Sequence, residues 1–441
     1  MAYLQQVLFL VVIASAVFML FKRVKFIKAS INLGKPDDRS GNTSERLKNM
    51  MLVAFGQSKM FKKPVAAFLH LFVYVGFVLI NIEVLEILID GLFGTHRIFA
   101  PYLGSYYTYL INFFEFLGFS VLLACIFFLI RRNILNIPRF HKPEMKSWPF
   151  LDANIILVTE ILLMAAILKM NAVDQILQAR GVEHYVATGN LFFSSWLIPL
   201  LEGFSTSTLI IFERTFWWFH LIGIMAFAVY VTYSKHLHIF LAFPNTYFAS
   251  LKSRGEITNM DSVTNEVKMM LGLQPADEQA PPPDEIGRFG AKDVNDLSWK
   301  SIMDAFTCTE CGRCTTECPA NQTGKKLSPR KIMMDTRDRA EEITRSIQAG
   351  GKGLEDGKFL LDDYISREEL NACTTCNACV EACPVMIDPM AIIIDLRRYI
   401  VMEESGAPSD WNVMFQNIET SFAPWKFAPS DRFKWYEELK S

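Results

Sequence analysis

The hydrophobic residues of the chain gather in five long runs within its first 240 residues, and few charged residues interrupt them. A helix needs about 20 residues to cross a hydrocarbon layer of about 30 Å. The expected spans are residues 3–21, 64–90, 105–130, 150–171 and 209–240. The pattern therefore predicts a mainly α protein that begins with a five-helix transmembrane bundle.

For two of the apolar stretches, length and hydropathy alone do not decide whether they span the membrane. The run at 3–21 has no basic residue before it and no small-residue cleavage pattern after it, so we expect a membrane anchor and not a signal peptide. Residues 188–206 are apolar as well, but Pro199 and Gly203 interrupt them. We expect a short helix at the outer surface there instead of a sixth span.

Lys and Arg are distributed unequally over the connections between the spans. They recur from Lys22 to Lys63 and from Arg131 to Lys146, whereas the alternate connections carry little beyond Arg97 and Arg180. Basic connections resist translocation across the membrane. We therefore expect a multi-pass protein of a bacterial inner membrane, with everything after residue 240 in the cytoplasm.

Changes in composition along the chain predict its division into domains. The expected units are a membrane domain at 1–250, a linker at 251–295, a compact domain at 296–405 and a tail at 406–441. Within the linker, residues 274–287 combine four prolines with acidic residues, which is typical of an extended segment. The aromatic-rich tail is expected either to dock on a partner subunit or to cover its own domain.

The net charge and the positions of the cysteines exclude some classes of function and favour others. The formal net charge is −2, and no cluster of Lys and Arg in the second half marks a nucleic-acid partner. Eight of the nine cysteines lie between residues 308 and 383. This clustering favours cofactor ligation in a reducing compartment over a disulfide framework. The remaining Cys125 is expected to be a packing residue in the third span.

Two segments repeat the spacing C-x2-C-x2-C-x3-C-P. Three thiolates at this spacing can bind three corners of one [4Fe-4S] cluster, and the fourth cysteine ligates the other cluster. Zinc also uses C-x2-C pairs, but the third and fourth cysteines and the following proline in each copy favour clusters. The predicted ligand sets are Cys308, Cys311, Cys314 and Cys383 for one cluster, and Cys373, Cys376, Cys379 and Cys318 for the second.

Histidines in the apolar half form a second candidate site. Ionisable residues inside a membrane are costly and usually belong to a site. His70 and His238 lie at the same predicted depth near the cytoplasmic face, and we expect them to be the axial ligands of a b-type haem. His236 is the competing ligand, since it points to a different face. The alternative for this group is an interfacial position beside Lys235.

His220 occupies a different predicted depth. It precedes His238 by 18 residues, so a continuous helix would place both on one face, about 27 Å apart along its axis. Haem ligation competes evenly with an interfacial or quinone-site role for His220.

Acidic residues also lie in the predicted spans. Glu115 and Glu160 are expected either to relay protons to a quinone or to form hydrogen bonds between helices. Glu83, Glu86 and Asp90 approach the outer end of the second span, and we expect them to be solvated.

The cysteine-rich half resembles the helical two-cluster domain of heterodisulfide reductase and of fumarate reductase iron-sulfur subunits. The resemblance covers 297–405 and is carried by the 54 residues between the motifs, by Leu327-Ser328-Pro329 and by Leu396-Arg397-Arg398. It implies a helical domain that holds two clusters.

The membrane half resembles the gamma subunit of respiratory nitrate reductase and the cytochrome subunit of heterodisulfide reductase, on His70 and the stretch 217–238. That family has a second histidine three turns further along the second span, where this sequence has Ile80. The resemblance implies b-type haem, with one expected near the cytoplasmic side and a second left open.

Together the resemblances imply an electron-transfer subunit of a membrane oxidoreductase that connects a soluble redox partner to membrane quinone. No CCG triplet, dinucleotide fingerprint, flavin motif or nucleophile arrangement is visible. A separate CCG-domain or flavoprotein subunit is therefore the expected partner. A membrane-anchored iron-sulfur redox sensor and a self-sufficient electron-transfer-flavoprotein:quinone oxidoreductase are the alternatives.

Overall fold

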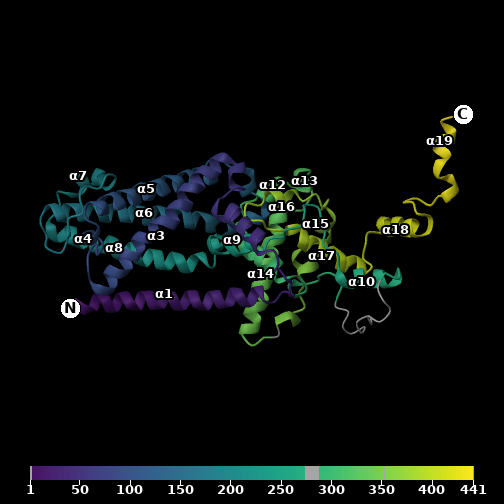
Figure 1. Ribbon diagram of the computed structural model, residues 1–441, viewed down its shortest axis with the longest axis horizontal. Helices are drawn as coiled ribbons and strands as arrows, with labels where there is room; N and C mark the ends of the chain where they lie inside the picture. Colours follow the sequence, from purple (N-terminus) through teal and green to yellow (C-terminus); the bar gives the residue numbers. More distant parts are fainter. Residues whose placement is uncertain (1, 274–287, 352, 441) are drawn as a thin grey trace.

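A computed structural model describes residues 2–273, 288–351 and 353–440, and within these ranges the chain is helical with no β-strand (Figure 1). The predicted extended segment at 274–287 lies outside the described residues. The helices of the first half are α1 (Ala2–Ile31), α2 (Thr43–Asn49), α3 (Pro64–Phe93), α4 (Ala100–Leu103), α5 (Ser105–Asn133), α6 (Trp148–Ala179), α7 (Ile198–Leu201), α8 (Thr206–Val231) and α9 (His238–Tyr247).

The second half contains shorter helices that surround the two cysteine motifs and continue into the tail (Figure 1). They are α10 (Asp261–Met270), α11 (Trp299–Thr307), α12 (Arg313–Thr316), α13 (Pro319–Gln322), α14 (Pro329–Gln348), α15 (Arg367–Asn371), α16 (Ala378–Ala382), α17 (Pro389–Met402), α18 (Ser409–Ser421) and α19 (Lys434–Glu438).

Five helices, α1, α3, α5, α6 and α8, are long and apolar enough to cross a membrane, which confirms the predicted five-helix bundle. Pro64 opens α3 and Gly94 ends it in the left-handed conformation, as residues at helix ends commonly do. The apolar stretch at 188–206 forms only a short 3-10 turn, Ser194–Leu197, followed by α7. It does not make a sixth span.

The basic connections lie at the end of the bundle that meets the cysteine-rich domain, whereas α4 and α7 lie at the opposite end (Figure 1). Lys63, just before α3, forms an ion pair with Glu317 (3.2 Å). In the connection between α5 and α6, Glu144 binds Arg330 at the start of α14 (2.7 Å). Both basic connections therefore face the cysteine-rich domain.

The fifth span is shorter than predicted. Its helix α8 ends at Val231, a 3-10 turn follows at Lys235–Leu237, and α9 begins at His238. Asp152 of α6 holds this break, because it accepts hydrogen bonds from the Ser234 hydroxyl (2.9 Å) and the Lys235 amide (3.2 Å). The prediction that His220 and His238 share one face of a continuous helix is therefore wrong.

The cysteine-rich domain has its own hydrophobic core between α11, α14 and α17. Ile302, Ile332 and Leu396, one from each helix, are fully buried in it. The Ser328 hydroxyl caps the start of α14 by accepting a hydrogen bond from the Lys331 amide. Residues 288–295, which composition assigned to the linker, also pack here, and Val294 is completely buried.

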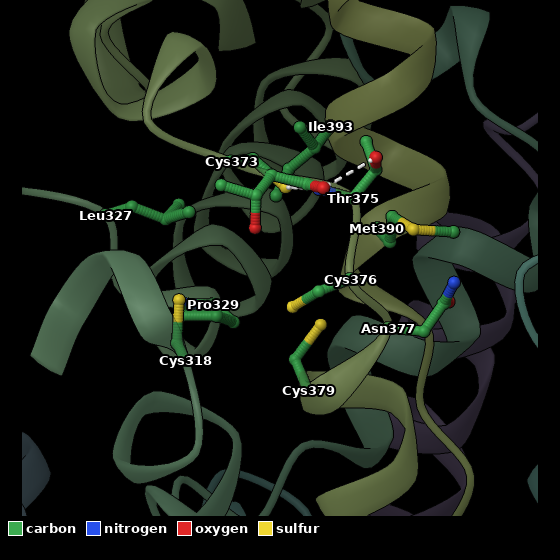
Figure 2. A pocket seen from close by; sticks show the side chains of 11 residues that line it. Cys318, Leu327, Pro329, Cys373, Thr375, Cys376, Asn377, Cys379, Met390 and Ile393 are labelled. Atoms are coloured by element: carbon green, nitrogen blue, oxygen red, sulfur yellow. Dashed lines mark hydrogen bonds between the residues drawn. The ribbon is translucent and has the colours of Figure 1, made fainter.

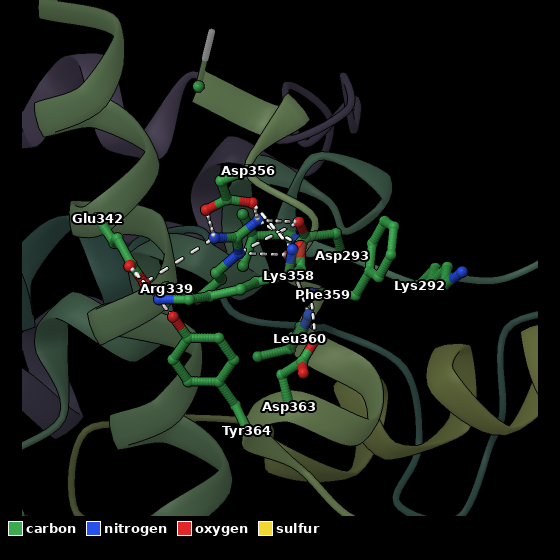
Figure 3. A network of polar contacts seen from close by, with 12 residues as sticks. Lys292, Asp293, Arg339, Glu342, Asp356, Lys358, Phe359, Leu360, Asp363 and Tyr364 are labelled. Atoms are coloured by element: carbon green, nitrogen blue, oxygen red, sulfur yellow. Dashed lines mark hydrogen bonds and ion pairs between the residues drawn. The ribbon is translucent and has the colours of Figure 1, made fainter. Parts of the chain in front are cut away.

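A buried ion-pair network fastens α14 to the start of this domain (Figure 3). The Arg339 side chain is fully buried and binds both carboxylate oxygens of Asp293, with Nη2–Oδ2 at 2.8 Å and Nε–Oδ1 at 3.1 Å. It also binds Asp356 and the carbonyl oxygen of Lys358 (2.6 Å). One guanidinium thus joins three segments that are distant in sequence.

We expect Arg339→Met to lower the free energy of unfolding of this domain by about 3–5 kcal/mol, because removing one partner leaves the buried Asp293 carboxylate uncompensated. The measurement is the urea midpoint for loss of cluster absorbance in the full chain. Arg345→Met is the matched control on the same helix, where the arginine is 66% exposed and pairs with Glu341. It should cost at most about 0.5 kcal/mol. Equal midpoints for the two variants would contradict the prediction.

The membrane half and the cysteine-rich domain share a core at their junction. Phe26 and Ile27 of α1 belong to the same hydrophobic cluster as the buried residues of the domain. Gly34 lies three residues after the end of α1, and a Cβ atom there would lie 2.5 Å from the backbone nitrogen of Trp299, so the approach requires glycine. An ion pair between Arg23 of α1 and Glu341 of α14 (2.6 Å) also joins the two parts. The junction is therefore a packed interface.

The tail projects away from the cysteine-rich domain (Figure 1). Its large apolar side chains are exposed to solvent. They include Phe422, Trp425, Phe427, Phe433 and Trp435. This exposure leaves the aromatic side chains available to another surface.

Candidate iron-sulfur and haem sites

The two cysteine motifs fold with the same backbone. In each, the residue before the second cysteine and the residue after it adopt the left-handed conformation: Glu310 (φ 53°) and Gly312 (φ 72°) in the first, Thr375 (φ 54°) and Asn377 (φ 60°) in the second. A short helix follows each loop and carries the third cysteine. Left-handed residues turn the chain sharply, so each loop wraps its cysteines around one centre.

Cysteines of both motifs line one cavity (Figure 2). Cys373, Cys376 and Cys379 come from the second motif, and Cys318 joins them from the end of the first motif. The cavity encloses about 320 Å³ of space not filled by atoms, its mouth included, and Leu327 and Ile393 contribute apolar walls. The structure therefore brings together one of the two predicted crossed ligand sets.

The other predicted set also converges. Cys308 and Cys383 are buried, and each is close enough to Cys311 for their charges to interact. Cys314 interacts electrostatically with Cys308, Cys311 and Cys383, and also with Cys379 of the other set. The contact between α12 and α16 brings the two motifs to this meeting point.

The donor chemistry of these thiols fits iron-sulfur clusters. Burial raises the pKa of Cys308 to about 12, and burial followed by repulsion from Cys311 raises that of Cys383 to about 11. Bound iron supplies the positive charge that deprotonates a coordinating thiol. Backbone amides already point at the sulfurs, from Thr375 to Cys373 (3.4 Å) and from Ile387 to Cys383 (3.3 Å). Such hydrogen bonds are one means of tuning cluster potentials.

Three of the four predicted histidines meet at the junction. His236 and His238 lie with ring centroids 5.5 Å apart, and His70, in the second turn of α3, is among the groups that act electrostatically on His236. Burial, followed by neighbouring His238, lowers the pKa of His236 well below its usual value, and burial lowers that of His238 to about 4. The latter two imidazoles are therefore neutral, the form that coordinates iron.

Hydrogen bonding distinguishes His236 from His238. The Nδ1 of His238 lies 3.3 Å from the carbonyl oxygen of Lys235, which orients the ring and leaves its other nitrogen for a metal. The Nδ1 of His236 is buried without a hydrogen-bond partner. Both arrangements fit an iron ligand, so the residues present are compatible with a haem at this junction.

An ion pair connects the 3-10 turn Lys235–Leu237, here called the histidine turn, to the first cysteine loop. Lys235 Nζ lies 2.8 Å from Glu310 Oε2, and Arg337 of α14 binds the other carboxylate oxygen at 2.9 Å. Although burial opposes it, the charges of Arg337 and Lys235 hold the pKa of Glu310 below its usual range. Sequence reasoning missed this link, and the only available signal was an acidic residue inside the cysteine spacing.

His220 lies apart from the other three histidines, in the middle of α8. Its Nδ1 is 3.0 Å from the carbonyl oxygen of Leu163 in α6, so Nδ1 carries the proton and donates it. Its Nε2 is buried and has no hydrogen-bond partner. The side chain is therefore oriented for a ligand at Nε2, at a depth different from that of His238.

The acidic residues near the outer end of α3 are buried, so the prediction that they are solvated is wrong. Glu83, Glu86 and Asp90 are 5%, 4% and 9% exposed. Asp90 accepts hydrogen bonds from Thr95 (2.5 Å) and the Arg97 amide (2.7 Å), so it caps the turn after α3. This turn folds back into the bundle and covers all three carboxylates.

Glu115 of α5 accepts hydrogen bonds from Asn171 of α6 (3.1 Å) and from the backbone amides of Phe193 (3.1 Å) and Ser194 (3.3 Å). It also binds the Ser194 hydroxyl. Its oxygens are thus used to join two helices and the loop before α7.

Comparison with known proteins identifies a 4Fe-4S dicluster domain at residues 307–387. Over 98% of its length the chain is 29% identical to the probable iron-sulfur-binding oxidoreductase FadF of Bacillus subtilis, and over 91% it is 26% identical to the EtfAB:quinone oxidoreductase of Syntrophomonas wolfei. The matches cover 60% and 55% of these relatives. The chain therefore spans somewhat more than half the length of the curated relatives it matches.

Other matches cover shorter parts of the chain. A probable membrane-anchored ferredoxin of Chromohalobacter salexigens is 30% identical over 34% of the chain and 24% of its own length. Subunits C of heterodisulfide reductases from Methanosarcina acetivorans and Methanosarcina mazei also match. No solved structure matches the chain significantly. The relatives are membrane-anchored iron-sulfur oxidoreductases, which confirms the predicted relationship to heterodisulfide reductase and the membrane location. The nitrate reductase-like cytochrome stays a prediction.

Proposed function

We propose that this chain is the electron-transfer subunit of a membrane oxidoreductase and passes electrons singly between a soluble redox partner and membrane quinone. The cavity that Cys318 shares with three cysteines of the other motif carries the proposal. Crossed ligation of this kind is the arrangement of two-cluster ferredoxins. When bound, two [4Fe-4S] clusters and a b-type haem would supply one-electron oxidation and reduction.

In this proposal each group of residues holds one centre. The two crossed cysteine sets hold the clusters, and His70 with His238 holds one haem at the junction, with His236 as the competing ligand. Lys235 and Glu310 fix the histidine turn against the first cysteine loop. Electrons thereby have a route from the cysteine-rich domain into the membrane bundle. His220 is the candidate ligand of a second haem, which this proposal leaves open.

The contacts of the basic connections, the similar proteins and the exposed tail support a location, a substrate and a partner for this chain. The basic connections contact the cysteine-rich domain, which supports a bacterial inner membrane with this domain in the cytoplasm. The relative named EtfAB:quinone oxidoreductase supports quinone as substrate and a flavoprotein as soluble partner. A subunit with a CCG domain is the other candidate partner. The exposed aromatic side chains of the tail at 406–441 support a docking role there.

The test measures iron, haem and electron transfer on the detergent-purified full chain. We expect about eight cluster irons and one b-type haem per chain, because each cluster contains four irons. After reduction by dithionite, addition of a short-chain naphthoquinone or benzoquinone should reoxidise both clusters and haem. Clusters without haem would favour an anchored sensor or a direct route from clusters to quinone. A fully reduced protein that neither quinone reoxidises would overturn the proposal.

A further inference from the structure

A cavity lies inside the membrane bundle between α3, α5 and α6. Its walls include Ile80, Phe114, Met164 and Ile167, and it encloses about 240 Å³ of space not filled by atoms, its mouth included. Glu83 also lines it and lies 13 residues after His70 on α3, about 20 Å along the helix axis. The cavity therefore lies toward the end of the bundle remote from the cysteine-rich domain.

Glu83 is the lining carboxyl group whose hydrogen bonding is incomplete. It is 5% exposed, and its Oε1 has no hydrogen-bond partner. Its ion pair with Arg97 is long (3.7 Å), and Arg97 also binds Asp174 (3.1 Å) and Asn171 (2.6 Å). A buried carboxyl oxygen without a hydrogen bond is costly. Glu83 thus retains the capacity to bind a group that enters the cavity.

The neighbouring carboxyl groups lack this capacity. Glu86 accepts from the Tyr107 hydroxyl (2.5 Å) and the Phe99 amide (2.9 Å). Glu115, which also lines the cavity, is occupied by Asn171 and the loop before α7. The cavity consequently offers apolar walls with one available carboxyl group.

The lining is mainly apolar, as the surroundings of a quinone ring require, and Glu83 can hydrogen-bond an oxygen on that ring. A Cβ atom added to Gly118 would meet only the Met164 sulfur, at 3.5 Å, so the wall is open there. We propose that the cavity binds the head group of a membrane quinone, and that Glu83 hydrogen-bonds one quinone oxygen and exchanges a proton with it. This assignment rests on the proposed function and adds the location and the proton-carrying residue.

The step balances as a two-electron reduction. The quinone receives two electrons, one at a time, and the reduced soluble partner supplies both. As an O–H bond forms on one quinone oxygen, the O–H bond of the Glu83 carboxyl breaks. A proton from solvent replaces the one that Glu83 gives up, and a second transfer from Glu83 gives the quinol. Quinol oxidation reverses each transfer.

The test uses holoprotein in detergent and two variants of the cavity. Gly118→Leu places a bulky side chain in the cavity, and we expect it to weaken binding of a short-chain naphthoquinone by about tenfold or more. Glu83→Gln should still bind the quinone, but quinone should reoxidise the reduced protein about 100-fold more slowly, as for loss of a general acid. Ferricyanide, a hydrophilic acceptor, should reoxidise both variants at the normal rate.

Two matched variants control for disruption. Gly118→Ala adds a methyl group at ordinary contact distance, and Glu202→Gln removes an exposed carboxylate elsewhere in the chain. Both should bind and react with quinone normally. Unchanged binding in Gly118→Leu, or an unchanged rate in Glu83→Gln, would overturn the location while wild-type quinone reactivity upheld the proposed function. A wild-type protein inert toward quinone would overturn both.

Discussion

Replacing Cys318 with alanine should remove the cluster of the opposite motif. Cys318 closes the first motif in sequence, yet its side chain lines the cavity of Cys373, Cys376 and Cys379. We expect Cys318→Ala to lower cluster iron from about eight to about four per chain. Its electron paramagnetic resonance spectrum after reduction should match that of Cys376→Ala. Cys383→Ala should instead give the spectrum of Cys311→Ala.

The comparison of spectra makes the crossed arrangement testable. If each motif bound its own cluster, Cys318→Ala would resemble Cys311→Ala, and the crossed assignment would be wrong. Cys125→Ala is the control for cysteine loss in general. Cys125 packs in the bundle among Val121 and Ile156, and its variant should keep both clusters.

His70→Ala should abolish the junction haem while both clusters remain assembled. His70 comes from α3, whereas His238 begins α9, so an iron held between them would lose one of its two axial ligands. We expect near-complete loss of the b-type signal in the reduced-minus-oxidised visible spectrum. The cluster iron should stay at about eight per chain, because the cysteine sets are separate.

The two histidines of the 3-10 turn and α9 provide the internal comparison. His238→Ala should reproduce the loss in His70→Ala, and His236→Ala should retain the haem. Loss of haem in His236→Ala with retention in His238→Ala would transfer the ligand role to His236. Full haem in His70→Ala would refute the whole junction assignment.

Sequence patterns were sufficient for the spans because a membrane helix depends on the local run of apolar residues, and five apolar runs became five helices. The crossed ligand sets stay a prediction, although the structure places Cys318 beside the cysteines of the second motif. The repeated cysteine spacing was the signal for that distant contact. Length, hydropathy and motif spacing therefore carry most of the architecture of this chain.

The errors arose where a tertiary contact overrides the local pattern. The break after Val231 depends on Asp152, which lies in another helix, and local hydropathy favoured a continuous span. Burial of Glu83 depends on the turn around Arg97 folding back over α3. The Lys235–Glu310 pair joins residues 75 positions apart. Such contacts leave no periodic trace in a single sequence.

The packing of α1 against the cysteine-rich domain constrains biogenesis. Translation releases Phe26 and Ile27 early, yet they complete a core that also contains Leu396 and Ile400. The second cysteine motif and α17 emerge only after all five spans have been synthesised. We therefore expect that the spans enter the bilayer before this core is complete, and that iron is loaded close to the membrane surface.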